Sequence, residues 1–165
     1  MLWLGYSTFR ITSTTGKIIV IDPFLKTNPR TPAKYKDLTV LGKVDLPELA
    51  KLTGATDVAN YELANTMVAL GTLDATKTLG INIGGMVSPI GPGIKVHMVP
   101  AEHTSSPDMK EMKPEWIGTP FVTVGTAIGY VMELESGFKI YHSGDTNVFG
   151  DMDAGALTAG LLPRR

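Results

Sequence analysis

The chain has 165 residues, which suits one domain and allows burial of roughly 70% of the surface that the unfolded chain exposes. Hydrophobic residues make up 43% and charged residues 19%, a composition typical of a globular protein. Fifteen Lys and Arg against sixteen Asp and Glu give a net charge of −1, so we expect no nucleic-acid partner and no membrane partner. The chain has no cysteine, which excludes disulfides, thiolate nucleophiles and Cys-ligated metals.

The N-terminal segment MLWLGYSTFR has neither a basic region nor a long apolar run of the kind found in secretory signals. The longest apolar stretch, residues 121–134, is interrupted by glycines and is too short to span a bilayer. We therefore expect a soluble, cytoplasmic protein, and the lack of cysteine fits a reducing compartment.

The first forty residues have the pattern of β structure. Strands are predicted over Thr8–Thr12 and Lys17–Ile21, joined by a tight turn that contains Gly16. The apolar run Ile18–Ile21 is typical of a strand that is covered on both faces. Two prolines and four Lys or Arg predict a solvated loop over residues 26–37.

Two helices follow in the prediction. Asp45 is a candidate N-cap for a helix that runs to Leu52, and Asn60 is a candidate N-cap for one that runs to Leu70. A short strand is expected between them, over residues 55–59. The order helix, strand, helix favours a layered α/β arrangement over an all-β sandwich.

The second half returns to strand patterns. Apolar and polar residues alternate over Ile94–Val99, which predicts a strand with one buried face. Residues 121–133 and 137–142 are expected to form an antiparallel pair. The composition does not shift along the chain, so a single domain over residues 1–165 is predicted.

Candidate metal ligands follow three of these strands. His103 and Asp145 carry nitrogen and oxygen donors suited to zinc, manganese or iron. Asp22, which precedes a proline, is more typical of a turn residue, and Gly-Asp-Thr segments such as 144–146 are also common in turns. His142 is either a ligand or a core histidine hydrogen-bonded to the backbone, and the second interpretation is favoured.

Taken together, the segments of this chain resemble one family. In order, they are WLGYSTFRI, IIVIDPFL, NPRTPAKY, LAKLTGA, VANYELA, NIGG, VPAEHTSS and IYHSGDTNVFGDM. They resemble the metal-dependent hydrolases of the metallo-β-lactamase superfamily, in the branch that includes ascorbate-phosphate lactonase-like proteins. The resemblance covers nearly the whole chain. It implies an α/β fold, a four-layer αββα sandwich with a metal site at one edge of its two sheets.

The resemblance also implies roles for individual residues. Asp22 matches the acidic residue that supports the metal-binding loop, His103 a histidine ligand, and Asp145 the aspartate that usually bridges two metal ions. His142 lies beside this aspartate, and Glu102, Asp22 or His142 is the possible third ligand of a site with one metal ion. In such hydrolases the metal lowers the pKa of a bound water and polarises the substrate. The implied cofactor is a divalent metal, at most one per chain: zinc first, with manganese or iron as alternatives.

Three features depart from the family pattern. The defining H-x-H-x-D-H loop is missing, because the chain has only three histidines, none in an H-x-H arrangement, and Val44 leads almost directly into Leu46-Pro47. Tyr6 stands where the family commonly has histidine. Residues 160–163 resemble a late strand, but the sequence stops at Arg165. We therefore expect an incomplete sandwich that is internally shortened near residues 44–47 and truncated at the C-terminus.

These observations leave three hypotheses about function. The first is a hydrolase of small-molecule esters, lactones or phosphoesters with an impaired metal site. The second is a catalytically inactive relative that acts as a binding or assembly module. In the third, the printed sequence omits segments of a longer protein. Loss of an interior strand would expose strand edges, so a homo-oligomer formed through these edges is also expected.

Overall fold

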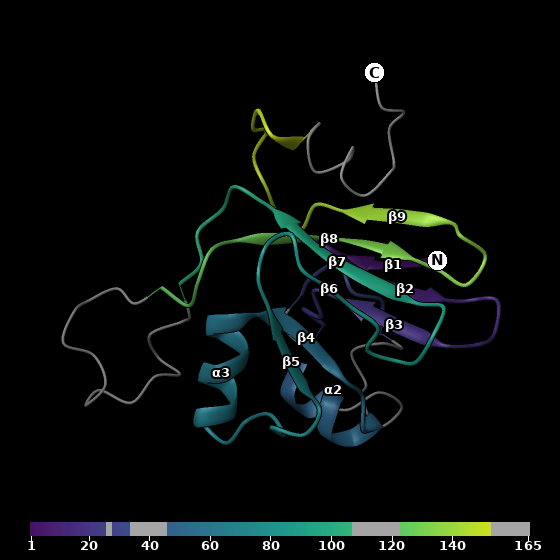
Figure 1. The fold of residues 1–165 in the computed structure, drawn as a ribbon, viewed down its shortest axis with the longest axis horizontal. Coiled ribbons are helices and arrows are strands. Elements are labelled where there is room, and N and C mark those ends of the chain that lie inside the picture. The colour runs from purple at the N-terminus through teal and green to yellow at the C-terminus, as the bar shows by residue number, and fades with distance from the viewer. Residues whose placement is uncertain (26–27, 34–45, 107–122, 153–165) are drawn as a thin grey trace.

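The computed structural model describes residues 1–25, 28–33, 46–106 and 123–152 (Figure 1). These parts of the chain contain three sheets and two helices, so the predicted α/β class is confirmed. The strands are β1 (Leu2–Gly5), β2 (Thr8–Thr12), β3 (Ile18–Ile21), β4 (Asp57–Asn60), β5 (Thr78–Ile81), β6 (Met86–Val87), β7 (Lys95–Pro100), β8 (Ile128–Glu133) and β9 (Lys139–His142). The helices are α2 (Leu46–Thr53) and α3 (Tyr61–Ala69).

The predicted N-terminal hairpin is present. Strands β2 and β3 pair antiparallel, and β1 adds to the other edge of β2. Gly16 closes the turn with a φ of 85°, a value that glycine adopts without steric cost. The prediction that both faces of Ile18–Ile21 are covered is wrong, because Ile18 is 54% exposed. Its position at the turn end of the hairpin leaves its side chain in solvent.

A four-stranded antiparallel sheet has the order β6-β7-β8-β9. The predicted alternation along β7 is confirmed, since Val96 and Met98 are buried whereas Lys95 and His97 are only partly covered. Strands β8 and β9 also form the expected antiparallel pair, although both are shorter than predicted.

The core lies between the N-terminal sheet and the four-stranded sheet. Ile11 and Ile21 from the former pack with Val96 and Met132 from the latter. Burial of such side chains contributes roughly 1.5–3 kcal/mol each, so this contact is a main source of stability. Because the two sheets share this core, the loops that follow β3, β7 and β9 belong to one packed unit (Figure 1).

Strands β4 and β5 form a separate parallel pair that carries α3. The predicted N-cap at Asn60 is confirmed, because its Oδ1 accepts a hydrogen bond of 2.7 Å from the Leu63 amide. The helix predicted after Asp45 is also present as α2, but Asp45 itself lies outside the described residues. Neither helix in the described part of the chain is long and apolar enough to cross a membrane.

A buried carboxylate on β4 makes stability depend on pH. Asp57 is 4% exposed, and burial raises its pKa from 3.8 to about 6. The folded state therefore binds the proton more tightly than the unfolded state, and stability should fall as pH rises from about 4 to about 6. We expect Asp57→Asn to flatten this slope and to raise the free energy of unfolding at pH 7 by about 1.5 kcal/mol, a value reduced for solvent screening.

Urea titrations of both proteins at several pH values between 4 and 7 would measure this effect. The exposed Asp151 offers the matched control, because Asp151→Asn makes the same chemical change in solvent and should leave the profile unaltered. An unchanged slope in Asp57→Asn would show that another group causes the pH dependence.

Candidate metal centre

The order of the strands brings two candidate ligands together. Strands β7 and β9 both pair antiparallel with β8, so they run in the same direction and end at the same edge of the sheet. The loops that follow them are joined by two hydrogen bonds: the Glu102 amide donates to Thr146 Oγ1 at 2.8 Å, and the Asn147 amide donates to the Glu102 carbonyl at 3.0 Å. His103 and Asp145 lie on these joined loops.

The side chains of His103 and Asp145 face each other, with 3.7 Å between Nε2 and Oδ2. The other ring nitrogen, Nδ1, is 3.0 Å from the Thr104 carbonyl. A carbonyl can only accept, so Nδ1 carries a proton, and in the neutral imidazole Nε2 then keeps a free lone pair. Histidine ligands in metal sites are commonly oriented by such a bond from the second nitrogen. Both side chains are accessible, with 45% of His103 and 76% of Asp145 exposed.

The chemistry of this pair fits a divalent cation, since imidazole nitrogen and carboxylate oxygen are both zinc ligands. The pair is nevertheless short of a complete centre. The described residues contain no group of three or more His, Cys, Asp or Glu side chains placed to hold a metal. A catalytic zinc typically takes three protein ligands and a water, so this pair is one candidate ligand short of such a site within the described part of the chain.

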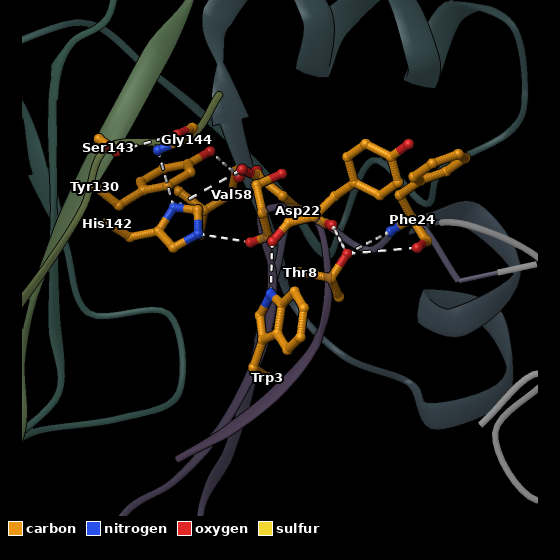
Figure 2. Close-up of polar contacts among 11 residues, drawn as sticks. Trp3, Thr8, Asp22, Phe24, Val58, Tyr130, His142, Ser143 and Gly144 are labelled. Carbon is orange, nitrogen blue, oxygen red and sulfur yellow. Dashed lines mark hydrogen bonds and ion pairs between the residues drawn. The ribbon is translucent and has the colours of Figure 1, made fainter. Parts of the chain in front are cut away.

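His142 has a different environment from His103 (Figure 2). Its Nε2 is 2.7 Å from the Ser7 carbonyl, and its Nδ1 accepts a hydrogen bond of 3.1 Å from the Gly144 amide. The ring is therefore neutral, with its proton on Nε2. Neither nitrogen has a lone pair free for a metal, so the favoured interpretation of His142, a core histidine bonded to the backbone, describes this geometry.

Asp22 lies next to His142 and near the Gly144–Asp145 segment. Its Oδ2 is 3.8 Å from His142 Nδ1, too far for a hydrogen bond. Burial raises the pKa of the Asp22 carboxyl, and a hydrogen bond with Ser7 acts in the opposite direction. The backbone of Asp22 has a φ of 45°, in the left-handed region that residues other than glycine seldom adopt.

A hollow of about 400 Å³ lies beside these residues, and its wall is formed by Tyr6, Ser7, Phe9, Tyr141, His142, Ser143, Gly144 and Asp145. Tyr6 also has a left-handed backbone, with a φ of 47°, and its carbonyl accepts a hydrogen bond of 2.7 Å from Trp3 Nε1. Strained backbone of this kind is often found at functional sites. Sequence reasoning missed Ser7, because its contribution is a backbone carbonyl, which no residue type signals.

Comparison with known proteins identifies the superfamily to which this fold belongs. Residues 35–161 match the model of the beta-lactamase superfamily domain, which covers most of the chain. The chain therefore belongs to the metallo-β-lactamase superfamily, as its motifs predicted.

Among its relatives are proteins named UPF0173 metal-dependent hydrolases. The one from Cupriavidus necator is 41% identical over 167 positions, with 92% of this chain and 57% of the relative covered. The one from Polaromonas is 42% identical, with 92% of this chain and 60% of the relative covered. The one from Thermococcus onnurineus is 38% identical, with 98% of this chain and 70% of the relative covered. The chain thus spans about three fifths of the length of the first two.

Proposed function

We propose that this chain is a metal-dependent hydrolase of small-molecule esters, lactones or phosphoesters whose metal site is reduced to His103 and Asp145. The observation that carries the proposal is the 3.7 Å approach of His103 Nε2 to Asp145 Oδ2, with Nδ1 bonded to the Thr104 carbonyl. Proteins named metal-dependent hydrolases, about 40% identical over most of this chain, support it. One divalent cation binds per chain, zinc in the first place and manganese or iron otherwise.

His103 and Asp145 would hold the cation, and the Thr104 carbonyl keeps His103 in the tautomer that exposes Nε2. A bound divalent metal would supply a water of lowered pKa and would polarise the substrate. The hollow beside Asp145 offers room for a small substrate, with Tyr6 and Tyr141 on its wall. With two protein ligands, the affinity for metal and the rate are both lower than in a site with three protein ligands.

The proposal includes an internal shortening near residues 44–47 and, with it, an incomplete αββα sandwich. The aligned region with the Cupriavidus necator relative extends over 167 positions, more than the 165 residues of this chain, yet it takes in only 92% of them. Some positions inside that region therefore have no counterpart here. Within the described residues β3 pairs only with β2, and β4 pairs only with β5. These open edges favour pairing with a second copy of the chain.

Metal stoichiometry tests the proposal directly. We expect about one zinc per chain after dialysis against micromolar zinc, measured by elemental analysis, and loss of that zinc in His103→Ala and in Asp145→Ala. His97→Ala and Asp151→Ala are the matched controls: the former changes a histidine on β7, the latter an exposed aspartate, and both should bind zinc like the wild type. Hydrolysis of p-nitrophenyl acetate and of bis-p-nitrophenyl phosphate would then follow the metal content.

A second candidate function is a catalytically inactive binding or assembly module. The observation that favours it is the shortage of ligands, since the described residues offer two of the three that a zinc hydrolase takes. A wild-type protein that binds no zinc, manganese or iron would exclude the hydrolase and leave this alternative. Retained zinc in both His103→Ala and Asp145→Ala would move the site elsewhere in the chain.

A further inference from the structure

We propose that His142 is a positioning residue that holds the Gly144 backbone so that Asp145 faces His103. His142 is not a metal ligand in this arrangement. The inference deepens the proposed function and rests on it in one respect, the use of Asp145 as a ligand. The geometric part, that His142 fixes the backbone at Gly144, stands on contacts within the chain alone.

The imidazole ring of His142 joins two distant parts of the chain (Figure 2). On one side Nε2–H donates to the carbonyl of Ser7, between β1 and β2, 135 residues earlier in the sequence. On the other side Nδ1 accepts from the amide of Gly144 at 3.1 Å. The ring also packs edge-to-face on Phe9, with 5.6 Å between ring centroids and an interplanar angle of 80°. Each of these contacts limits rotation of the ring, so the acceptor at Nδ1 has a defined position.

Asp145 needs such support because its own side chain has little. It is 76% exposed, so packing does not orient it. The residue before it, Gly144, has a φ of 68°. This left-handed conformation is open to glycine but disfavoured for β-branched and bulky residues. The direction of the Asp145 side chain therefore depends on how the backbone on either side of it is held. Thr146 and Asn147 bond to Glu102 on one side, and on the other side His142 Nδ1 holds the Gly144 amide.

The nearby carboxylate of Asp22 does not replace the Gly144 amide as the hydrogen-bond partner of His142 Nδ1. Its Oδ2 is 3.8 Å from Nδ1, whose single lone pair already accepts the Gly144 amide. An ion pair between the two would require a proton on Nδ1 and would break the bond to Gly144. The observed bonds thus assign His142 the neutral form with one donor and one acceptor.

Two substitutions separate these two hydrogen bonds. Asparagine places its side-chain oxygen near the position of Nδ1, so His142→Asn keeps an acceptor for Gly144 but loses the donor to Ser7. Glutamine places its amide nitrogen near the position of Nε2, so His142→Gln keeps the donor to Ser7 but loses the acceptor for Gly144. Both variants lose the ring packing on Phe9, so they differ only in which bond remains and in one methylene.

The first measurement is hydrogen exchange of the Gly144 amide by NMR in metal-free protein, with thermal unfolding to confirm that each variant is folded. We expect exchange to become about tenfold faster in His142→Gln and to stay near the wild-type rate in His142→Asn. The order parameter of the Asp145 amide should fall from about 0.85 towards 0.6 in His142→Gln alone. The second measurement is zinc affinity by calorimetry, which should weaken 10–100-fold in His142→Gln and far less in His142→Asn.

Equal losses in the two variants, or a larger loss in His142→Asn, would overturn the inference, because His142 would then act only through packing or the Ser7 bond. Faster exchange at Gly144 with unchanged zinc affinity in His142→Gln would show that the backbone at Gly144 does not control Asp145 as a ligand. A wild-type protein without zinc affinity would refute the proposed function instead. In that case exchange at Gly144 and the order parameter of Asp145 still decide whether His142 holds this backbone.

Discussion

Replacing Gly129 with alanine is expected to lower the free energy of unfolding by about 3 kcal/mol, because the new methyl group meets backbone that cannot move aside. Gly129 is a buried residue of β8. A Cβ at this position would lie 2.8 Å from the carbonyl oxygen of His142 and 3.1 Å from that of Ser143. Relief of this contact requires β8 and the end of β9 to separate.

The same separation would act on the candidate metal centre. His142 and Ser143 directly precede the Gly144–Asp145 segment, so a shift of their carbonyls also moves Asp145 relative to His103. We therefore expect Gly129→Ala to weaken zinc binding together with stability. Chemical denaturation and zinc calorimetry on the same preparation would measure both effects.

Gly150 offers the matched control for this substitution. A Cβ at Gly150 would have no heavy atom within 4 Å, and this glycine has no left-handed φ. Gly150→Ala should therefore leave stability within about 0.5 kcal/mol of the wild type. A Gly129→Ala protein as stable as Gly150→Ala would mean that the two strands separate at little cost, contrary to the close contact described.

The second large effect is expected from Thr8→Val, which should cost about 2–4 kcal/mol although the two side chains have nearly the same shape. Thr8 is fully buried, with 0% of its surface exposed. Its hydroxyl donates to the Asp22 carbonyl at 2.6 Å and accepts from the Phe24 amide at 3.0 Å (Figure 2). Valine lacks the hydroxyl, so the Asp22 carbonyl and the Phe24 amide both lose their hydrogen bond to this side chain.

The backbone at Asp22 has a left-handed conformation, which persists only where surrounding contacts hold it. Loss of the Thr8 hydroxyl should therefore also loosen the segment after β3. Proteolysis or hydrogen exchange at residues 22–24 would detect this local change, and urea titration would give the stability.

Thr8→Ser is the control that separates the hydroxyl from the methyl group. Serine keeps both hydrogen bonds and loses one methyl, so a cost of about 1 kcal/mol is expected. If serine and valine destabilise the protein equally, packing of the methyl group rather than the hydrogen bonds holds Asp22, and the explanation given for Thr8 is wrong.

Local patterns in the sequence predicted several elements well. The hairpin of β2 and β3, the cap at Asn60 and the alternation along β7 each depend on residues within one or two turns of each other. Such features arise from backbone preferences and from side chains that hydrogen-bond to nearby amides. They are therefore readable without knowledge of the fold.

Other elements had no local signal. Strands β1, β5 and β6 were not predicted: β1 and β5 have four residues each, and β6 has two. Their existence depends on a neighbour to pair with, such as β4 for β5. The exposure of Ile18 has the same origin, because an apolar residue is covered only where another element packs over it.

The sequence by itself determined the α/β class, the superfamily and the donor chemistry of His103 and Asp145, since these depend on residue type and order. Only the tertiary structure decided which donors meet. His103 approaches Asp145 because β7 and β9 flank β8 and end at one edge. His142, an equally plausible ligand by residue type, has both nitrogens engaged by backbone groups, one of them 135 residues away. Hydrogen bonds to backbone carbonyls and amides leave no trace in residue identity, and they form only when the sheets pack.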